Sequence, residues 1–315
     1  MSAYRALAPA KVNLGLFLGP TRPSDARHEL VTVMQSISLA DELTLECAPS
    51  GVSDDEVICP GVAAPAQQNL AAAALRAFRA ATGWDAPPLR LRIRKRIPVA
   101  AGLAGGSADA AAALRLAVRA SGLGDEELLR ELGAELGADV PAQVRPGRWL
   151  ATGAGERLDA LPEASPSLGL LLLPLAVELS TAAVYAEADR LGLVRPQSAL
   201  SDRCRALHAA LQRGAPVPGE RELLHNDLQE AAISLCPQIA QALAQAREAG
   251  AEQALVSGSG PTVVGLFPPP ARSAIGGLEL ARSAAAGLSG RFPAPICATS
   301  VDAAFAEVAS VTRPA

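Results

Sequence analysis

Alternating hydrophobic and polar residues dominate the first fifty positions of the chain. They predict strands over residues 4–18, 30–39 and 41–47, with a polar turn after the first strand. Residues 89–97 alternate apolar with basic side chains and predict a further strand. The chain therefore opens with a β-rich region.

Helical spacing appears between and after these strands. Apolar residues recur every three or four positions over residues 68–82, 107–120 and 125–136, and Gly83 follows the first of these segments. Residues 137–141 begin with glycine and end with proline, which terminates the third segment. We expect three helices in this part of the chain.

The second half follows residues 147–166, whose Gly, Pro and polar content predicts a hairpin and a domain junction. Its pattern then predicts a buried strand over 168–175, helices over 181–191, 226–234 and 238–249, a loop over 215–219, a strand pair within 254–267, a last helix after the prolines at 268–270 and a closing strand over 294–301. Strands and helices mix without regular βαβ alternation, which predicts an α+β fold. The length of 315 residues favours two domains, 1–155 and 156–315.

Composition fits a globular protein and restricts its partners. Half of the residues are hydrophobic, and the net charge of −4 gives no broad basic surface, so we expect no nucleic acid partner. The longest apolar run, residues 168–175, is too short to span a membrane, and the N-terminus does not resemble a signal peptide. Five scattered cysteines without a C-x-x-C pair argue against disulfides and zinc. These features predict a cytoplasmic protein without membrane association.

A glycine-rich turn at residues 98–107 leads from a predicted strand into an alanine-rich helix. Gly102, Gly105 and Gly106 allow backbone N–H groups to approach an anion, and the helix beginning near Ser107 adds the positive end of its dipole. The turn therefore predicts a site for a nucleotide polyphosphate. The alternative is a tight strand-to-helix turn that binds nothing.

Two common nucleotide motifs do not fit this turn. A Walker A loop needs a lysine before the Ser or Thr, whereas Ser107 follows Gly106 directly. A dinucleotide fingerprint belongs at the first strand, whereas this turn lies a third of the way along the chain. Both classes are excluded.

Lysine is nearly absent from the chain. Only Lys11 and Lys95 occur among 28 basic residues, and the others are arginines. An ammonium is a compact point charge that a planar guanidinium cannot imitate, so these two positions are candidates for binding a single atom. The alternative for Lys11 is a side chain that extends to the surface.

Two more segments carry polar groups in apolar surroundings. Asp139 follows a predicted helix end, where its alternative role is to cap the next turn. Residues 256–265 form a glycine turn followed by a strand rather than a helix, and the alternative there is a plain β-turn.

Taken in order, these segments resemble the GHMP kinases, the superfamily of galactokinase, homoserine kinase and mevalonate kinase. The matching segments are residues 8–14, 27–30, 95–98 with 105–111, 137–141, 180–181 with Tyr185, 226–228 and 257–261. The resemblance implies a two-domain architecture, with an N-terminal nucleotide-binding β-rich domain and a C-terminal ferredoxin-like domain. It also implies ATP and Mg²⁺ as cofactors.

The resemblance implies roles for individual residues. Asp139 corresponds to the catalytic base and Lys11 to its partner. The cofactor-binding positions are Asn69, Lys95, Pro98, Gly102, Leu103, Ala104, Gly105, Gly106 and Ser107. Among these, Ser107 is also the candidate metal contact, and Asn69 and Lys95 correspond to positions near the adenine.

The nearest branch of the superfamily phosphorylates the 2-hydroxyl of 4-diphosphocytidyl-2-C-methyl-D-erythritol, a cytidine diphosphate-linked polyol of the non-mevalonate isoprenoid pathway. The corresponding substrate positions are Asn13, Arg27, His28, Thr181, Tyr185, Gly258 and Ser259. The branch usually has an aromatic residue where this chain has Arg27. We expect its guanidinium plane to stack on cytosine instead.

Two alternatives stay open at this point. One is another small-molecule kinase of the superfamily, of the homoserine or mevalonate type. The other is a catalytically silent nucleotide-binding regulator, against which the presence of both Lys11 and Asp139 argues. We expect a monomer or a weak homodimer.

Overall fold

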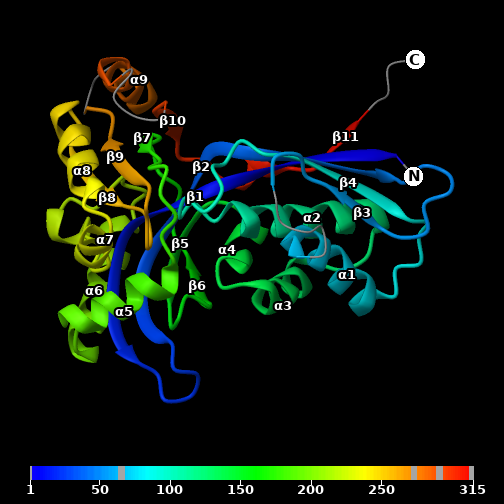
Figure 1. Cartoon of the computed structure of the whole chain (residues 1–315), viewed down its shortest axis with the longest axis horizontal. Helices are drawn as coiled ribbons and strands as arrows, with labels where there is room; N and C mark the ends of the chain where they lie inside the picture. Colours follow the sequence, from blue (N-terminus) through cyan, green and yellow to red (C-terminus); the bar gives the residue numbers. More distant parts are fainter. Residues whose placement is uncertain (1, 63–67, 271–274, 289–293, 312–315) are drawn as a thin grey trace.

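Two β-sheets organise the structure, a computed structural model that describes residues 2–62, 68–270, 275–288 and 294–311. Within these residues one sheet has seven strands and the other has four (Figure 1). Helices pack on both sheets, which confirms the α+β fold predicted from the sequence.

The first sheet is built around one long antiparallel pair, β1 and β2. Its strands are β1 (Ala3–Thr21), β2 (His28–Cys47), β3 (Glu56–Ile58), β4 (Leu89–Arg94), β5 (Arg148–Thr152), β6 (Arg157–Ala160) and β11 (Ala309–Val311). The order is β11-β1-β2-β4-β3, and the β5–β6 hairpin pairs with β2. The register of β1 against β2 shifts between Pro9 and Lys11 and again between Asn13 and Gly15. Such irregularities bend a strand and redirect its side chains, here on either side of residues 11–13.

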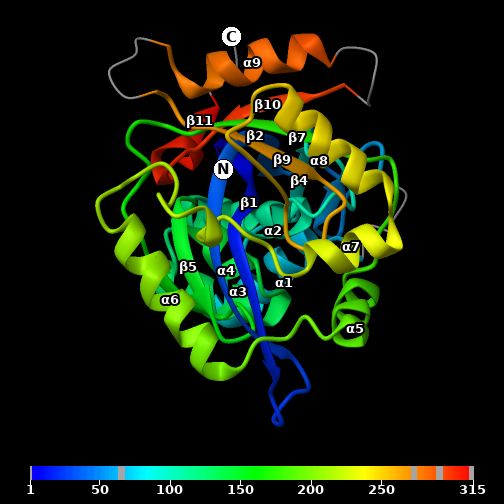
Figure 2. The same ribbon diagram turned by 90° about the vertical axis from the view of Figure 1, so that its left-hand side faces the viewer.

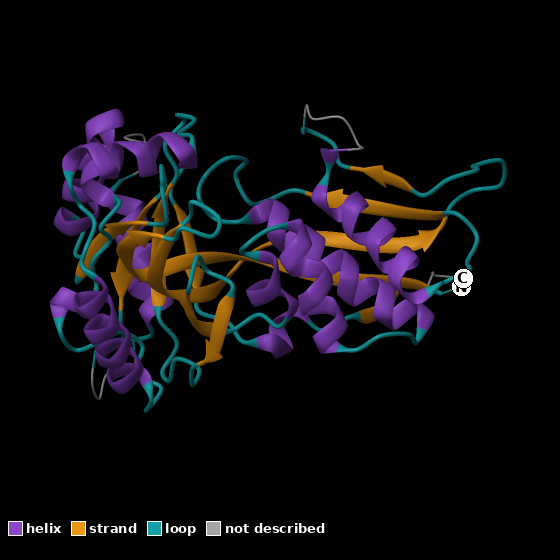
Figure 3. Cartoon of the chain, turned by 90° about the horizontal axis from the view of Figure 1, so that it is seen from below, coloured by secondary structure: helices purple, strands orange, loops and turns teal. Residues whose placement is uncertain are grey.

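Four helices cover one face of this sheet. They are α1 (Leu70–Thr82), α2 (Gly105–Ser121), α3 (Glu126–Leu136) and α4 (Val140–Val144), and Figure 3 shows them as a layer in front of the strands. Buried alanines along α2, among them Ala108 and Ala112, carry no side chain beyond Cβ and allow close approach to α1 and β1. The apolar alternation of β4 turns Leu89, Leu91 and Ile93 toward these helices.

The second sheet has the order β10-β7-β9-β8, and its neighbouring strands are all antiparallel. Its elements are β7 (Gly169–Leu173), α5 (Thr181–Leu191), α6 (Gln197–Leu211), α7 (Gln229–Leu235), α8 (Gln238–Glu248), β8 (Gln253–Val256), β9 (Val263–Phe267), α9 (Gly277–Gly287) and β10 (Ile296–Thr299). Along the chain, helices connect β7 to β8 and β9 to β10, whereas β8 leads directly into β9. Together with the strand order, this connectivity is the ferredoxin-like arrangement (Figure 2).

One core joins the two sheets. Leu170 and Leu172 of β7 face Val12 and Val31 of the β1–β2 pair in a single apolar cluster. The alternate residues of β7 face α5, α7 and α8 in another cluster. Two-residue alternation along β7 therefore buries both faces of the second sheet.

Several predicted boundaries differ from the structure, three of them for the connectivity or extent of an element. The segments 30–39 and 41–47 form the single strand β2. Strand β4 ends at Arg94 because the backbone N–H groups of Arg96 and Ile97 donate to the Asp41 carboxylate instead of continuing the sheet. The helix predicted over 226–234 begins only at Gln229.

Several elements were missed. Strand β3, helices α4 and α6, and strand β11 had no prediction, and two short 3₁₀ segments, Arg221–Leu223 and Ala303–Ala306, also lie outside the predicted elements.

The proposed domain boundary at residue 155 falls in the turn between β5 and β6, and β11 pairs with β1 after the second sheet is complete. The two sheets therefore do not divide the chain at one point.

Two absences concern the described residues. None of their helices is long and apolar enough to cross a membrane. All five cysteines are free thiols, as the cysteine pattern predicted.

Candidate active site

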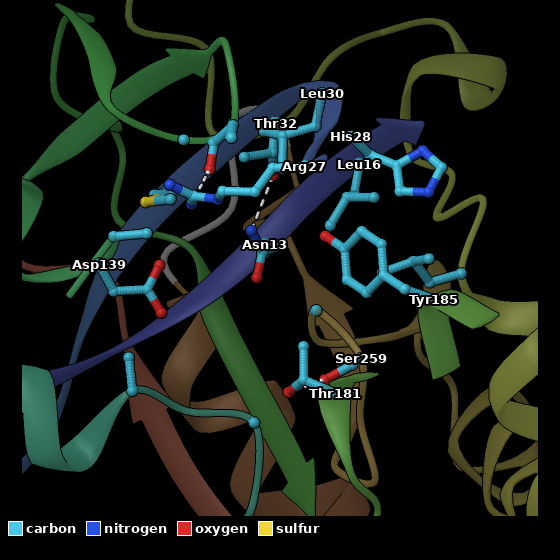
Figure 4. A pocket seen from close by; sticks show the side chains of 18 of the residues that line it. Asn13, Leu16, Arg27, His28, Leu30, Thr32, Asp139, Thr181, Tyr185 and Ser259 are labelled. Atoms are coloured by element: carbon cyan, nitrogen blue, oxygen red, sulfur yellow. Dashed lines mark hydrogen bonds between the residues drawn. The ribbon is translucent and has the colours of Figure 1, made fainter. Parts of the chain in front are cut away.

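A cleft of about 660 Å³ opens where β1 and β2 meet the start of α5 (Figure 4). Its lining residues come from β1 (Lys11, Asn13, Leu16), from the start of β2 and the preceding turn (Ala26, Arg27, His28, Leu30, Thr32, Met34), from the glycine-rich turn (Gly102, Ala104, Ser107), from the start of α4 (Ala138, Asp139), from the β5–β6 turn (Ala154, Gly155), from α5 (Thr181, Ala182, Tyr185) and from the second half (Leu228, Gly258, Ser259). Most of the predicted site residues thus border one cavity.

A lysine and a carboxylate far apart in the sequence meet in this cleft. The Nζ of Lys11 lies 3.5 Å from Oδ2 of Asp139 and donates to Oδ1 of Asn13 at 2.9 Å. The Lys11 side chain is only 9% exposed, whereas that of Asp139 is 31% exposed. Lys11 therefore does not extend to the surface, and its ammonium faces two oxygen atoms inside the cleft.

Asp139 does not cap α4, although it precedes that helix. Its side chain accepts no hydrogen bond from the first turn of α4, and in Figure 4 its carboxylate points into the cavity toward Asn13. This geometry removes the turn-capping alternative. The carboxylate therefore faces the cavity and Lys11 rather than the helix.

The glycine-rich turn, residues 98–107 and hereafter the phosphate loop, presents backbone to the cleft. Ala104 precedes α2 at φ 55° with no side-chain cap, whereas Asn69 and Asp125 cap α1 and α3 with their side chains. The first N–H groups of α2 are thus left without a side-chain acceptor beside the cleft residues Gly102, Ala104 and Ser107. An anionic group fits such a helix start.

Six predicted cofactor positions do not line this cleft. They are Asn69, Lys95, Pro98, Leu103, Gly105 and Gly106. Leu103 is buried in the core, although its carbonyl accepts from the backbone N–H of Lys11 at 3.1 Å. Asn69 and Lys95 lie near the start of α2. A Cβ on Gly106 would be 3.6 Å from Leu70, the neighbour of Asn69, and a Cβ on Gly105 would be 3.4 Å from Nζ of Lys95.

Lys95 is held between two buried carboxylates. Its ammonium binds Oδ2 of Asp41 and, at 2.7 Å, Oδ2 of Asp109. Burial alone would lower the pKa of Lys95, but the two carboxylates outweigh it and raise that pKa. Burial, and then the charge of Asp41, raise the pKa of Asp109 against the opposing effect of Lys95. Lys95 also borders a second cavity of about 390 Å³ beside β3 and β4.

His28 and Tyr185 form the end of the cleft near α5, and Arg27 borders the cleft from the β5–β6 side. The rings of His28 and Tyr185 lie 5.6 Å apart at 39°, and Arg27 donates from Nη2 to the carbonyl of Ala154 at 2.9 Å. Figure 4 shows the Arg27 guanidinium directed away from Tyr185. Burial, followed by the charge of Asp139, raises the pKa of Tyr185 to about 12, so its phenol remains protonated near neutral pH.

His28 is oriented by contacts at both ring nitrogens. Its Nδ1 lies 2.9 Å from the carbonyl oxygen of Gly19, and its Nε2 lies 3.2 Å from Oδ1 of Asp189 on α5. A carbonyl oxygen only accepts, so Nδ1 carries the proton of that bond. Asp189 has no counterpart among the predicted site residues.

Other cleft residues were also missed by the sequence analysis. Leu30, Thr32 and Met34 of β2 point into the cleft at alternate positions, and Thr32 accepts from Asn13 Nδ2 at 2.8 Å. Their two-residue spacing within a predicted strand was the available signal. At the opposite edge, Thr181 and Ser259 have their hydroxyl oxygens 3.0 Å apart.

The residues present fit a phosphate-bound Mg²⁺ better than a metal held by protein alone. No group of three or more His, Cys, Asp or Glu side chains that could hold a metal occurs in the part of the chain that the structure describes. Mg²⁺ in nucleotide sites is bound by one or two protein oxygens together with phosphates. Ser107, in the cleft, supplies such an oxygen.

Comparison with known proteins shows which family this sequence resembles. The model of the GHMP kinases N terminal domain matches residues 69–147, and that of the GHMP kinases C terminal domain matches residues 207–290. A protein of Kineococcus radiotolerans named 4-diphosphocytidyl-2-C-methyl-D-erythritol kinase is 41% identical, covering 86% of this chain and 83% of that protein. A Streptomyces coelicolor protein of the same name is 43% identical, covering 81% and 84% respectively.

Solved structures agree with the sequence relatives. A crystal structure of 4-(cytidine 5'-diphospho)-2C-methyl-D-erythritol kinase is 32% identical, with a TM-score of 0.72, and covers 94% of this chain and 98% of that chain. Family models match both halves of the sequence, and a relative that is 41% identical covers 86% of it. The chain therefore belongs to the GHMP kinase family.

Proposed function

We propose that the protein transfers the γ-phosphoryl group of ATP to the 2-hydroxyl of 4-diphosphocytidyl-2-C-methyl-D-erythritol. The observation that carries this proposal is the Lys11–Asp139 pair, 3.5 Å apart, in a cleft bordered at one end by the phosphate loop and at the other by His28 and Tyr185. A base and a cation thus lie between a site for phosphates and a site for a ring.

Asp139 acts as the base. Its carboxylate takes the proton of the acceptor hydroxyl while that oxygen forms a bond to the γ-phosphorus, and the bond between this phosphorus and the bridging oxygen breaks to release ADP. General bases of this kind contribute about 10²–10⁴ in rate, and electrostatic placement supplies much of the rest. Lys11, whose ammonium lies 3.5 Å from that carboxylate, faces the charge that spreads over the transferring group.

The phosphate loop holds the β- and γ-phosphates through its backbone N–H groups and the start of α2. Mg²⁺, held by phosphate oxygens with Ser107 as the candidate protein contact, would neutralise part of their charge. Asn69 and Lys95 correspond to positions near the adenine. Lys95 borders both the second cavity and the start of α2, and Leu70, the neighbour of Asn69, packs near Gly106 at that helix start, which supports the assignment.

The cytosine belongs at the end of the cleft that contains His28 and Tyr185. Tyr185 offers a ring for stacking, and Arg27 borders the same cavity from the β5–β6 side. Stacking by Arg27 requires its guanidinium to leave the Ala154 carbonyl. Asn13, Thr181, Gly258 and Ser259 would then contact the diphosphate and the polyol.

An acceptor comparison tests the proposal. Purified protein is supplied with ATP and Mg²⁺ and, in separate reactions, with 4-diphosphocytidyl-2-C-methyl-D-erythritol, homoserine or mevalonate, and ADP formation is measured. We expect turnover with the first acceptor at a kcat/KM at least a hundredfold above the others. Preference for homoserine or mevalonate would assign another kinase activity, and no turnover with any acceptor would support a regulatory nucleotide-binding protein.

A further inference from the structure

A short segment of the second half extends the edge of β1 next to the active site. The backbone N–H of Leu16 donates to the carbonyl of His225 at 2.8 Å, and the N–H of Asp227 donates to the carbonyl of Leu16 at 2.9 Å. Asn226 lies between these two bonds and is only 1% exposed. Asn226 thus pairs with β1 as one residue of an additional strand would, but its polar side chain is buried in the protein.

The amide of Asn226 uses all of its hydrogen-bonding groups except one acceptor position. Nδ2 donates to the carbonyl of Val256 at 2.8 Å and to that of Gly258 at 2.7 Å, and Oδ1 accepts from the N–H of Leu228 at 2.9 Å. An amide has two donor hydrogens, and both are directed at the chain that leaves β8. Gln229 supports the same chain, since its Oε1 accepts from the N–H of Val256 at 3.1 Å.

The chain held by Asn226 is the turn at residues 257–260, hereafter the serine-glycine turn, and it touches both ends of the proposed reaction. Its carbonyls approach Gly102 so closely that a Cβ there would be 2.6 Å from the oxygen of Gly260. A Cβ on Gly258 would be 3.3 Å from Oδ1 of Asn13 and 3.7 Å from Nζ of Lys11. The turn therefore packs against the phosphate loop and against the cation of the site.

We propose that Asn226 is a positioning residue, which sets the serine-glycine turn against Gly102 and Lys11 and thereby fixes the distance between the phosphate loop and the acceptor. This role rests on the proposed function for its catalytic readout. Asn226 itself does not line the cleft. It acts through the backbone of the turn, since the carbonyls of Val256 and Gly258 both accept from its amide.

A purely structural role makes a different prediction. If Asn226 only stabilises the fold, its replacement lowers the melting temperature and leaves the kinetics of the folded protein unchanged. If it positions the turn, both nucleotide binding and turnover change in protein that is fully folded. Displacing reacting groups by about 1 Å can reduce a rate about a hundredfold.

The test uses Asn226→Asp, which keeps the shape and the Oδ1 acceptor but loses both donors, and Asn226→Ala, which removes the donors without adding charge. The matched control is Gln253→Ala. Gln253 donates an amide hydrogen to the carbonyl of Leu224 at 3.2 Å in the same half of the molecule and lies outside the turn. All proteins are assayed well below their measured melting temperatures.

We expect both Asn226 variants to bind a non-hydrolysable ATP analogue about tenfold more weakly and to lose about a hundredfold in kcat, while Gln253→Ala stays within twofold of the parent protein. Unchanged binding and turnover in folded Asn226→Asp or Asn226→Ala would overturn the proposal. Should the parent protein fail to phosphorylate the cytidine substrate, the proposed function fails. The binding comparison still decides the role of Asn226, because it needs no acceptor.

Discussion

At the residue scale, the pairing of Lys11 with Asp139 determines what the cleft can do. The ammonium is nearly buried, yet it is shared between the amide of Asn13 and a carboxylate that remains partly open to the cavity. A guanidinium has five donors in a planar fork and does not fit this small, single-point contact. The chain uses arginine at all but two of its basic positions, so lysine here reflects the geometry of the site.

Replacing Asp139 by alanine removes the proposed base and leaves the phosphate loop intact. We expect kcat to fall by about 10²–10⁴ while the affinity for a non-hydrolysable ATP analogue changes less than threefold. Single-turnover transfer and isothermal titration measure the two quantities. Asp159→Ala, at an exposed position of β6, serves as the control. Unchanged turnover in Asp139→Ala would remove this residue from the mechanism.

Asp189 offers a separate prediction about the acceptor. Its carboxylate lies 3.2 Å from Nε2 of His28, and Nδ1 of the same ring is hydrogen-bonded to the carbonyl of Gly19. Asp189 therefore contacts the imidazole from outside the cleft, which Asp189 itself does not line. Asp189→Ala removes this contact, and we expect the KM for the cytidine substrate to rise three- to tenfold while the KM for ATP stays the same. Steady-state kinetics with each substrate varied in turn measure both values. An equal rise in both KM values would contradict a role confined to the acceptor.

The sequence predicted much of the cleft because its chemistry is concentrated in short segments. Lys11, Asn13, His28, Asp139 and Tyr185 are all candidates from the sequence alone, and they share one cavity. Residues that act through others lack such a signal. Asp189 is one of two acids on α5, and Asn226, although it lies in the matching segment 226–228, precedes a helix in a position where capping alone would explain it.

At the element scale, the phosphate loop depends on an unusually close approach of two backbones. Gly102 has φ +75°, and a Cβ there would lie 2.6 Å from the oxygen of Gly260 and 2.9 Å from that of Ser257. Ser257 donates from its hydroxyl to the carbonyl of Gly102 at 3.4 Å. Loop and turn therefore form one unit, although more than 150 residues separate them in sequence.

Gly102→Ala separates backbone strain from steric contact when compared with Gly122→Ala. Gly122 has φ +72°, but a Cβ there would meet no atom within 4 Å, so alanine costs only the left-handed strain of about 1 kcal/mol. We expect Gly102→Ala to lose more stability than this and to weaken binding of an ATP analogue at least tenfold. Urea unfolding and titration provide the measurements. Equal effects of the two substitutions would show that the backbone contact is unimportant.

Secondary structure was predictable where the pattern was long and regular. Helix α5 was predicted with its observed ends, and α1 and α3 differ from their predictions by one or two residues, since Asn69 and Asp125 cap them and Gly83 follows α1. The three-residue strands β3 and β11 have too few residues to show alternation and exist because longer neighbours pair with them. Helix α6 is capped by proline rather than by a side-chain acceptor, so the usual start signal is weak.

At the scale of the whole molecule, the two sheets are joined by more than their shared core. Strand β11 returns to β1, and the segment containing Asp227 binds Leu16 and Leu18 of that same strand. Oδ2 of Asp227 accepts from the N–H of Leu18 at 2.9 Å, and Arg195 binds both carboxylate oxygens at 2.7 Å. No local sequence pattern predicts these long-range connections, because each depends on the final position of β1.

The ion pair at Asp227 gives the molecule a predictable response to acid. Burial alone would raise the pKa of Asp227, but hydrogen bonds from His225 and Arg195 outweigh it and hold that pKa below the usual value. The ionised carboxylate therefore stabilises the folded state fully above the unfolded value of about 3.9, and this contribution is lost as the pH falls further through the folded pKa. Acid should thus weaken the connection between β1 and the second half.

Asp227→Asn tests this connection by urea unfolding between pH 3 and 7. Breaking a largely buried pair leaves Arg195 without its partner, so we expect a loss of about 3 kcal/mol at pH 7 that shrinks steadily below about pH 4. Asp202→Asn is the control, because its pair with Arg205 is exposed on α6 and should change stability by less than about 0.5 kcal/mol. A difference between Asp227→Asn and the parent protein that stays constant from pH 7 to pH 3 would mean that the carboxylate charge does not hold the two halves together.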